Sequence, residues 1–196
     1  MGAMTEARPE RQRVTISDPQ VMRALAHPAR LAIMEHLSSL PGGATATECA
    51  ELVGLSPSAT SYHLRALAGF GLVEQAPSRG DARERVWRAF SPSYHVDAGQ
   101  AADSEARAAE LALVEAHIAR DTQRTRDWLR RAPEESPEWY AVGSFSDSVL
   151  LLTAEELAAL NEAVHGLLEP YRRRLRQDPP ADARTVAVQW RSVPID

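Results

Sequence analysis

The amino-acid sequence predicts a mainly α-helical protein of the α+β class, and three observations lead to this prediction. Residues 54–73 contain, in order, the signals of a turn, a capped helix, a glycine stop and a strand. Two short runs with strand-like composition fall within residues 72–90, the second with alternating side chains. Residues 100–131 contain neither proline nor glycine and are typical of one long helix.

The best-defined helix begins at Ser56. Its hydroxyl can accept a hydrogen bond from a free amide of the first turn, which makes it a good N-cap. Pro57 then occupies the first helical position, where a missing N–H costs nothing. Gly69 and Gly71 end the helix, because glycine tolerates the left-handed backbone of a C-cap.

This helix has two different faces at about 100° per residue. The side predicted to pack inward carries Thr60, Leu64, Leu67 and Ala68. The opposite side carries Ser58, Ala59, Tyr62 and Arg65, with Ser61 and His63 on the flanks. The outer face is therefore hydroxylic, aromatic and basic, with no carboxylate. This face fits a helix that enters a DNA groove, and it fits an ordinary solvated helix equally well. The choice between the two interpretations depends on the elements around the helix.

Composition is that of an ordinary soluble globular protein of 196 residues, with 44% hydrophobic and 25% charged residues. No apolar run approaches the roughly 18 residues that span a bilayer, and residues 1–13 lack the apolar core of a signal peptide. The single cysteine, Cys49, excludes an intrachain disulfide and fits a reducing compartment. We therefore expect a cytoplasmic protein with no membrane partner.

The net charge of −5 is unevenly distributed along the chain. Residues 1–95 hold 10 arginines against 9 acids, whereas residues 96–196 hold 12 against 18. The acidity belongs to the second half, which leaves the first half compatible with nucleic acid as a partner.

The remaining elements of the first half are short. Residues 1–16 are expected to be a disordered arm. Asp18 and Pro19 start a short helix, and His27-Pro28 ends it and starts a second one that runs through Leu37. Thr45 or Thr47 caps a third, with Gly54-Leu55 turning out of it.

Two short helices joined by a glycine-containing turn, here before Ser56, are the signature of a helix-turn-helix. Strands are predicted at 72–75 and 85–90, and the polar segment between them carries Arg79 and Arg83. A helix-turn-helix followed by a basic-tipped hairpin is a winged helix, whose helix enters the major groove while the wing reaches the adjacent backbone.

Four motifs resemble those of the ArsR-type winged-helix transcriptional repressors. They are Arg23–Ile33 (RALAHPARLAI), Ala50–Ser56 (AELVGLS), Ser61–Leu67 (SYHLRAL) and Gly71–Val73 (GLV). They occur in the family's order and at its intervals, over roughly residues 18–90.

The resemblance implies a homodimeric repressor whose two helices read a two-fold-related operator in double-stranded DNA. The positions that it places at DNA are Ser58, Ala59, Ser61, Tyr62, His63, Arg65, Arg79, Arg83 and Arg85. Many relatives sense metals, but here the ligands are missing: Cys49 stands alone, and Glu115-Ala116-His117 is followed by Trp128 and Arg131 where further ligands are expected. We expect no metal, no cofactor and no catalytic residue, since Gly143-Ser144-Phe145-Ser146 is not a nucleophile elbow.

The second half is predicted to hold a long dimerisation helix and a small strand-helix-strand appendage. Strands are expected at 149–152 and 185–190, with a capped helix from Thr153 between them. The appendage either strengthens the dimer or lines a pocket for a small organic effector with Trp139, Tyr140, Tyr171 and Trp190.

The predicted organisation is an arm (1–16), a winged helix-turn-helix DNA-binding domain (17–95), a dimerisation helix (96–132) and a C-terminal α+β dimerisation or effector region (133–196). Two other functions stay open. One is a winged-helix module that binds another protein, and the other is a sensor that depends on its own thiol or on a metal.

Overall fold

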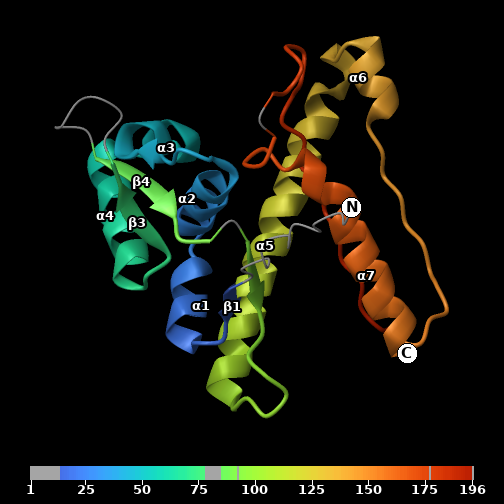
Figure 1. Ribbon diagram of the computed structural model, residues 1–196, viewed down its shortest axis with the longest axis horizontal. Coiled ribbons are helices and arrows are strands. Elements are labelled where there is room, and N and C mark those ends of the chain that lie inside the picture. Colours follow the sequence, from blue (N-terminus) through green and yellow to red (C-terminus); the bar gives the residue numbers. More distant parts are fainter. Residues whose placement is uncertain (1–13, 78–84, 92, 177, 196) are drawn as a thin grey trace, which may run out of the picture. The chain divides into compact units, whose positions relative to one another are not determined.

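Four short helices build the first part of the chain (Figure 1). The computed structural model describes residues 14–77, 85–91, 93–176 and 178–195. The helices are α1 (Pro19–Leu25), α2 (Pro28–Ser39), α3 (Ala46–Val53) and α4 (Pro57–Gly69). The expected helix-turn-helix is the pair α3 and α4, joined through Gly54 in the left-handed conformation at φ 67°. The winged-helix prediction is thereby confirmed.

Three of these helices, α1, α3 and α4, begin at a side-chain cap that the sequence signals. Asp18 accepts from the Gln20 amide at 2.7 Å, and the Ser56 hydroxyl accepts from the Ala59 amide at 3.2 Å. Thr45, not Thr47, caps α3, and Glu48 completes a capping box with it. The three bonds span two or three residues each, so the local sequence signals these helix starts, with Thr45 and Thr47 left open for α3.

The wing is a three-stranded sheet in the order β2-β4-β3, formed by β2 (Ala44–Thr45), β3 (Val73–Ala76) and β4 (Val86–Ala89). The pairings β2–β4 and β3–β4 are both antiparallel. Strand β4 does not alternate as expected, because Val86, Trp87 and Ala89 are all buried. β4 is the central strand of the sheet, and Arg88 is its exposed residue.

A second small sheet pairs β1 (Val14–Ile16) with β5 (Tyr94–Val96) in parallel. The prediction that residues 14–16 belong to a disordered arm is therefore wrong, whereas residues 1–13 lie outside the described residues. Ile16 joins the core of the unit, which also holds Met22, Leu25, Ile33, Leu37, Leu64, Leu67 and Leu113.

The long helix α5 spans Ser104–Arg131, close to the predicted range. Its first half contributes Ala109 and Leu113 to the core. The chain divides into two compact units within this helix, after Ala116. The predicted domain boundaries at 95 and 132 remain predictions.

The second unit holds the rest of α5, the 3₁₀ turn η1 (Ala132–Glu134), α6 (Pro137–Val142), α7 (Ala154–Leu168) and the turn η2 (Glu169–Tyr171). Thr153 and Glu156 form the expected capping box of α7. The strands expected at 149–152 and 185–190 are wrong for this chain by itself: both segments lack regular secondary structure, and neither pairs with a described strand. None of the described helices combines the length and hydropathy that a membrane span requires.

Candidate nucleic-acid interface

Helix α4 is held at both ends by local hydrogen bonds. Its C-terminus is closed by two bonds, from the Leu72 amide to the Leu67 carbonyl at 3.0 Å and from the Gly71 amide to the Ala68 carbonyl at 2.9 Å. Gly71 has φ 68°, and this pattern is a Schellman motif. Gly71 is thus the left-handed residue, and Gly69 is the last helical one.

The inward face of α4 is the predicted one. Thr60, Leu64 and Leu67 are completely buried. On the outer face Ser58, Tyr62 and Arg65 are exposed, with Tyr62 at 62% of its possible surface, while Ala59 and Ser61 are half-buried. The outer face thus offers a hydroxyl, an aromatic ring and a guanidinium to a partner.

His63 lies at the buried edge of this face, and its contact with DNA stays a prediction. It is only 9% exposed and packs against His27, with the ring centroids 4.8 Å apart. Its Nδ1 is buried with no hydrogen-bond partner among the described residues. Burial, the His27 ring and the Arg30 charge all lower the pKa of His63, so its neutral form is favoured.

His27 is a structural residue that the sequence interpretation missed. Its Nδ1 accepts a hydrogen bond from the Ala29 amide at 3.2 Å and so caps α2. Burial and then the Arg30 charge lower the pKa of His27 as well. The available signal was the pair His27-Pro28, which we interpreted only as a helix break.

Of the three wing arginines predicted to meet DNA, the structure describes Arg85. Arg85 precedes β4 and is exposed. Arg79 and Arg83 lie outside the described residues. Arg88 is directly opposite Glu74 in the β3–β4 register and forms an ion pair with it at 2.7 Å, so its charge is already balanced.

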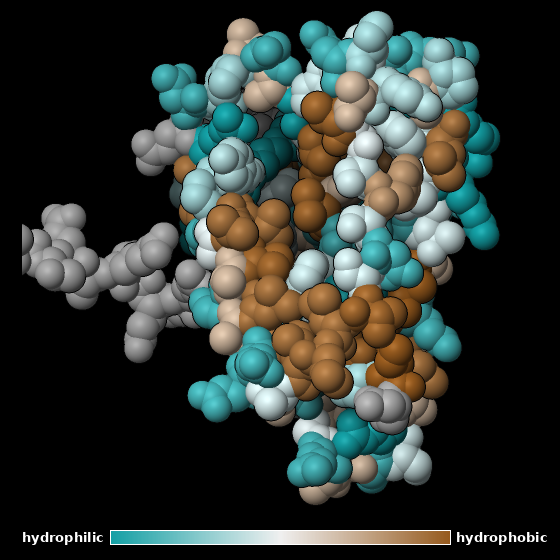
Figure 2. Space-filling model, turned by 90° about the vertical axis from the view of Figure 1, so that its right-hand side faces the viewer, coloured by the Kyte–Doolittle hydropathy of each residue, from teal (hydrophilic) through white to brown (hydrophobic). Residues whose placement is uncertain are grey.

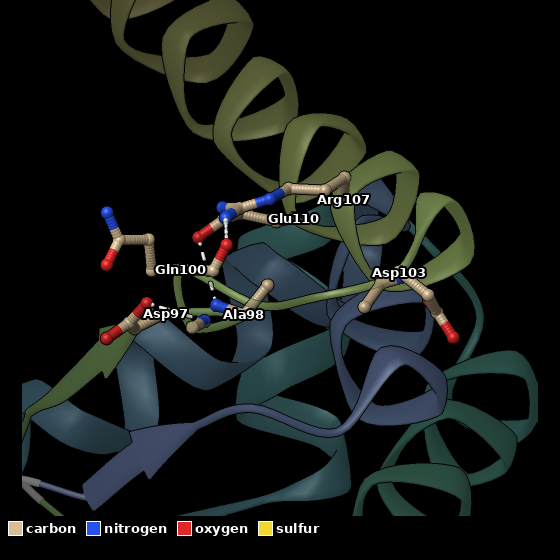
Figure 3. A network of polar contacts seen from close by, with 8 residues as sticks. Asp97, Ala98, Gln100, Asp103, Arg107 and Glu110 are labelled. Atoms are coloured by element: carbon tan, nitrogen blue, oxygen red, sulfur yellow. Dashed lines mark hydrogen bonds and ion pairs between the residues drawn. The ribbon is translucent and has the colours of Figure 1, made fainter.

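A polar network fastens the start of α5 to the loop that precedes it (Figure 3). Glu110 accepts from the Ala98 amide at 3.0 Å and from Arg107 at 3.2 Å. Arg107 also donates to the Gln100 carbonyl, and Asp103 caps the helix through the Ala106 amide. Because Ala109 and Leu113 pack in the core of the same unit, the network and the core together hold the first half of α5 in that unit.

The chemistry of Cys49 is that of an inert core residue. It is completely buried, and burial together with the neighbouring Glu48 charge raises the pKa of its thiol to about 11. A thiolate, the reactive form, is therefore rare at neutral pH. Within the described part of the chain, no three His, Cys, Asp or Glu side chains are grouped so as to hold a metal ion.

The four aromatic residues proposed for an effector pocket differ in their surroundings. The Arg184 guanidinium lies over the Trp139 ring, with its Cζ 4.7 Å from the ring centroid. Tyr140 stacks on Trp128. Tyr171 and Trp190 are exposed. An open cavity of about 250 Å³ does occur in the first unit, and its lining includes Val14, Ile16, Met34, Phe70, Phe90 and Tyr94.

Comparison with known proteins supports the class of protein that this geometry indicates. Residues 25–76 match the family described as a helix-turn-helix domain. Over 67 residues the chain is 43% identical to the HTH-type transcriptional regulator YgaV of Escherichia coli strain K12. That match covers 34% of this chain and 64% of the relative's length. The chain therefore carries a helix-turn-helix domain of the kind found in DNA-binding transcriptional regulators.

Solved structures show weak overall similarity. A double mutant of Lactococcus lactis ZitR in its apo form has a TM-score of 0.33 and 18% identity, over 74% of this chain and 83% of that one. The Mycobacterium tuberculosis MarR family protein Rv2887, in complex with salicylic acid, has a TM-score of 0.31 and 18% identity, over 77% and 87%. Both values are too low to assign the chain to either of these groups.

Proposed function

We propose that the protein is a homodimeric, sequence-specific transcriptional repressor of the ArsR type that works without a bound metal. The observation that carries the proposal is the outer face of α4. Ser58, Tyr62 and Arg65 are exposed side by side there, on a helix fixed at both ends. Arginine is the residue that pairs most specifically with guanine in the major groove, and hydroxyl groups suit bases and phosphates.

The exposed side of α5 supports the dimer. Leu111, Val114 and Ile118 are exposed at spacings of three and four residues, and Leu129 follows further along the helix. A helical stripe of this kind faces a partner helix in dimers. Pairing of two α5 helices would present two α4 helices to DNA, as a two-fold operator requires.

A small organic effector is part of the proposal, and the cavity in the first unit is its candidate site. The cavity surface is mostly apolar, and the polar residues of its lining are Thr15, Ser17, Asp18, Ser91 and Tyr94. Burial raises the pKa of Tyr94 strongly, so that its hydroxyl stays un-ionised over the physiological range. An uncharged, weakly polar ligand fits such a lining.

Fluorescence polarisation with DNA from upstream of the protein's own coding sequence tests the proposal. We expect affinity at least about 10³-fold above that for shuffled DNA. The affinity should fall steeply with salt, because phosphate contacts release counterions. Equal affinity for both DNAs would rule out a sequence-specific repressor and favour a module that binds another protein. The net charge of −5 supports that alternative, because a DNA-binding protein is usually basic.

A further inference from the structure

The C-terminal unit exposes most of its apolar side chains. Neither α6 nor α7 has a buried residue. Figure 2 shows hydrophobic side chains gathered on the face where α7 and the segment before it lie. The exposed large apolar residues of the described part of this region are Tyr140, Val142, Phe145, Val149, Leu150, Leu151, Leu152, Leu167, Tyr171, Leu175, Val186, Val188, Trp190, Val193 and Ile195.

Two segments without regular secondary structure carry most of these side chains, and their backbones are unpaired. Among the described residues, 144–152 and 185–195 form no backbone hydrogen bond. All residues of 144–152 are exposed, and Leu151 reaches 98%. Unpaired apolar strands are templates for pairing with another chain, and soluble proteins normally protect them.

The second segment is nevertheless held in place by its polar side chains. Trp190 donates to the Asn161 side chain of α7 at 2.7 Å, and Ser192 donates to the same oxygen at 2.9 Å. Arg184 forms two bonds of 2.9 Å with Glu135. The segment is therefore anchored, while Val186, Val188 and Val193 remain exposed.

The exposed surface has the size of a permanent interface. If each of the exposed apolar side chains keeps on the order of 100 Å² accessible, two copies could bury roughly 3,000 Å² of apolar surface. Obligate dimers bury about 2,000–5,000 Å² in total, whereas the largest apolar patch of a typical monomer is about 300–600 Å².

A second copy of the chain fits this surface better than an unrelated partner does. Charge is separated along the region: Glu155, Glu156 and Glu162 lie on α7, and an arginine run follows it at 172–174. An antiparallel copy places the acidic end of one against the basic end of the other. A two-fold contact also lets two identical unpaired segments satisfy each other.

We infer that the C-terminal unit is completed by a second copy of this chain, with segments 144–152 and 185–195 of each protomer lying against the partner and pairing there as strands. This inference rests on the homodimer of the proposed function and adds a second interface beyond α5. The strands predicted from sequence at 149–152 and 185–190 would then form between protomers.

Sedimentation equilibrium of the full chain tests the inference with two variants. Leu151→Asp should weaken dimerisation at least about 30-fold, the loss expected at an interface hot spot. Leu52→Asp is the matched control, because Leu52 is exposed on α3 and should leave the dimer unchanged. In a monomer neither substitution would matter, since Leu151 contacts almost nothing within its own chain.

Cross-linking gives an independent readout that does not depend on destabilising the dimer. In a Cys49→Ala background, Leu151→Cys and Val188→Cys are placed on two differently tagged chains, which are then mixed. Treatment with a short bis-maleimide should join the two tags.

The inference is overturned by a monomeric wild type, by a Leu151→Asp variant that dimerises like the control, or by the absence of a cross-link between the two tagged chains. Loss of DNA binding plays no part in this test. If the dimer depends on Leu151 but does not bind operator DNA, the proposed C-terminal interface is supported and the proposed repressor function is wrong.

Discussion

His27 and His63 lie with their ring centroids 4.8 Å apart, and this contact joins the start of α2 to the middle of α4. Both imidazoles have pKa values below their ordinary 6.5, in each case mainly because of burial. The neutral pair is therefore part of the packing that orients the outer face of α4.

The first prediction concerns the pH dependence of stability. Because the folded-state pKa values are depressed, the unfolded chain binds protons first as the pH falls below 6.5. The stability present above this pH should be lost as the pH falls through the folded-state values. Circular dichroism melts from pH 8 to 5 should show a falling Tm.

The variant His63→Gln should reduce the slope of Tm against pH in this range. His95→Gln is the control, because His95 is exposed on β5. A His63→Gln variant with the slope of the wild type would show that this pair does not govern the acid sensitivity.

The second prediction concerns recognition of DNA by α4. Arg65→Ala and Tyr62→Ala should each weaken binding to the operator by about 1–3 kcal/mol if the side chains reach bases. Binding to random DNA should change less. Arg23→Ala removes an exposed arginine from α1, where it pairs with Glu105 at 2.8 Å, and should leave operator affinity intact. Unchanged affinity in polarisation titrations would remove Arg65 or Tyr62 from the interface.

The third prediction concerns the start of β2. Gly43 has φ 70°, and a Cβ added there would lie 2.2 Å from the Trp87 carbonyl oxygen in β4. Gly43→Ala should therefore cost more than the roughly 1–2 kcal/mol of left-handed strain alone. Gly54→Ala measures that strain by itself, since its φ is 67° and no atom lies within 4 Å of the added Cβ. If urea denaturation shows the same loss in free energy of unfolding for Gly43→Ala and Gly54→Ala, the sheet accommodates the added Cβ without further destabilisation.

The fourth prediction separates a repressor from a thiol sensor. With a pKa of about 11, the Cys49 thiol should react with iodoacetamide at pH 7.5 about 300-fold more slowly than an ordinary thiol, from ionisation alone. In denaturant it should react at the ordinary rate. Oxidant should leave operator affinity unchanged, and Cys49→Ala should bind like the wild type. Fast labelling of the folded protein would contradict this prediction and support the hypothesis of a thiol-dependent sensor.

Local chemistry made the helices of the first unit predictable from the sequence. Ser56 and Thr45 bond to amides three residues away, and Gly71 adopts a conformation that its missing Cβ permits. The inward face of α4 followed from helical periodicity. Such signals act over one or two turns and need no knowledge of the rest of the chain, so Ser58, Tyr62 and Arg65 were placed on the exposed face from sequence alone.

Contacts between distant residues were decided only by the tertiary structure. Val14–Ile16 became a strand because Tyr94–Val96, some 80 residues later, lies beside it. His63 is buried in part because it packs against His27, and helical periodicity within α4 cannot reveal this contact. The apolar runs at 149–152 and 185–190 have strand composition, yet a strand exists only where a partner supplies hydrogen bonds, and a single chain offers them none.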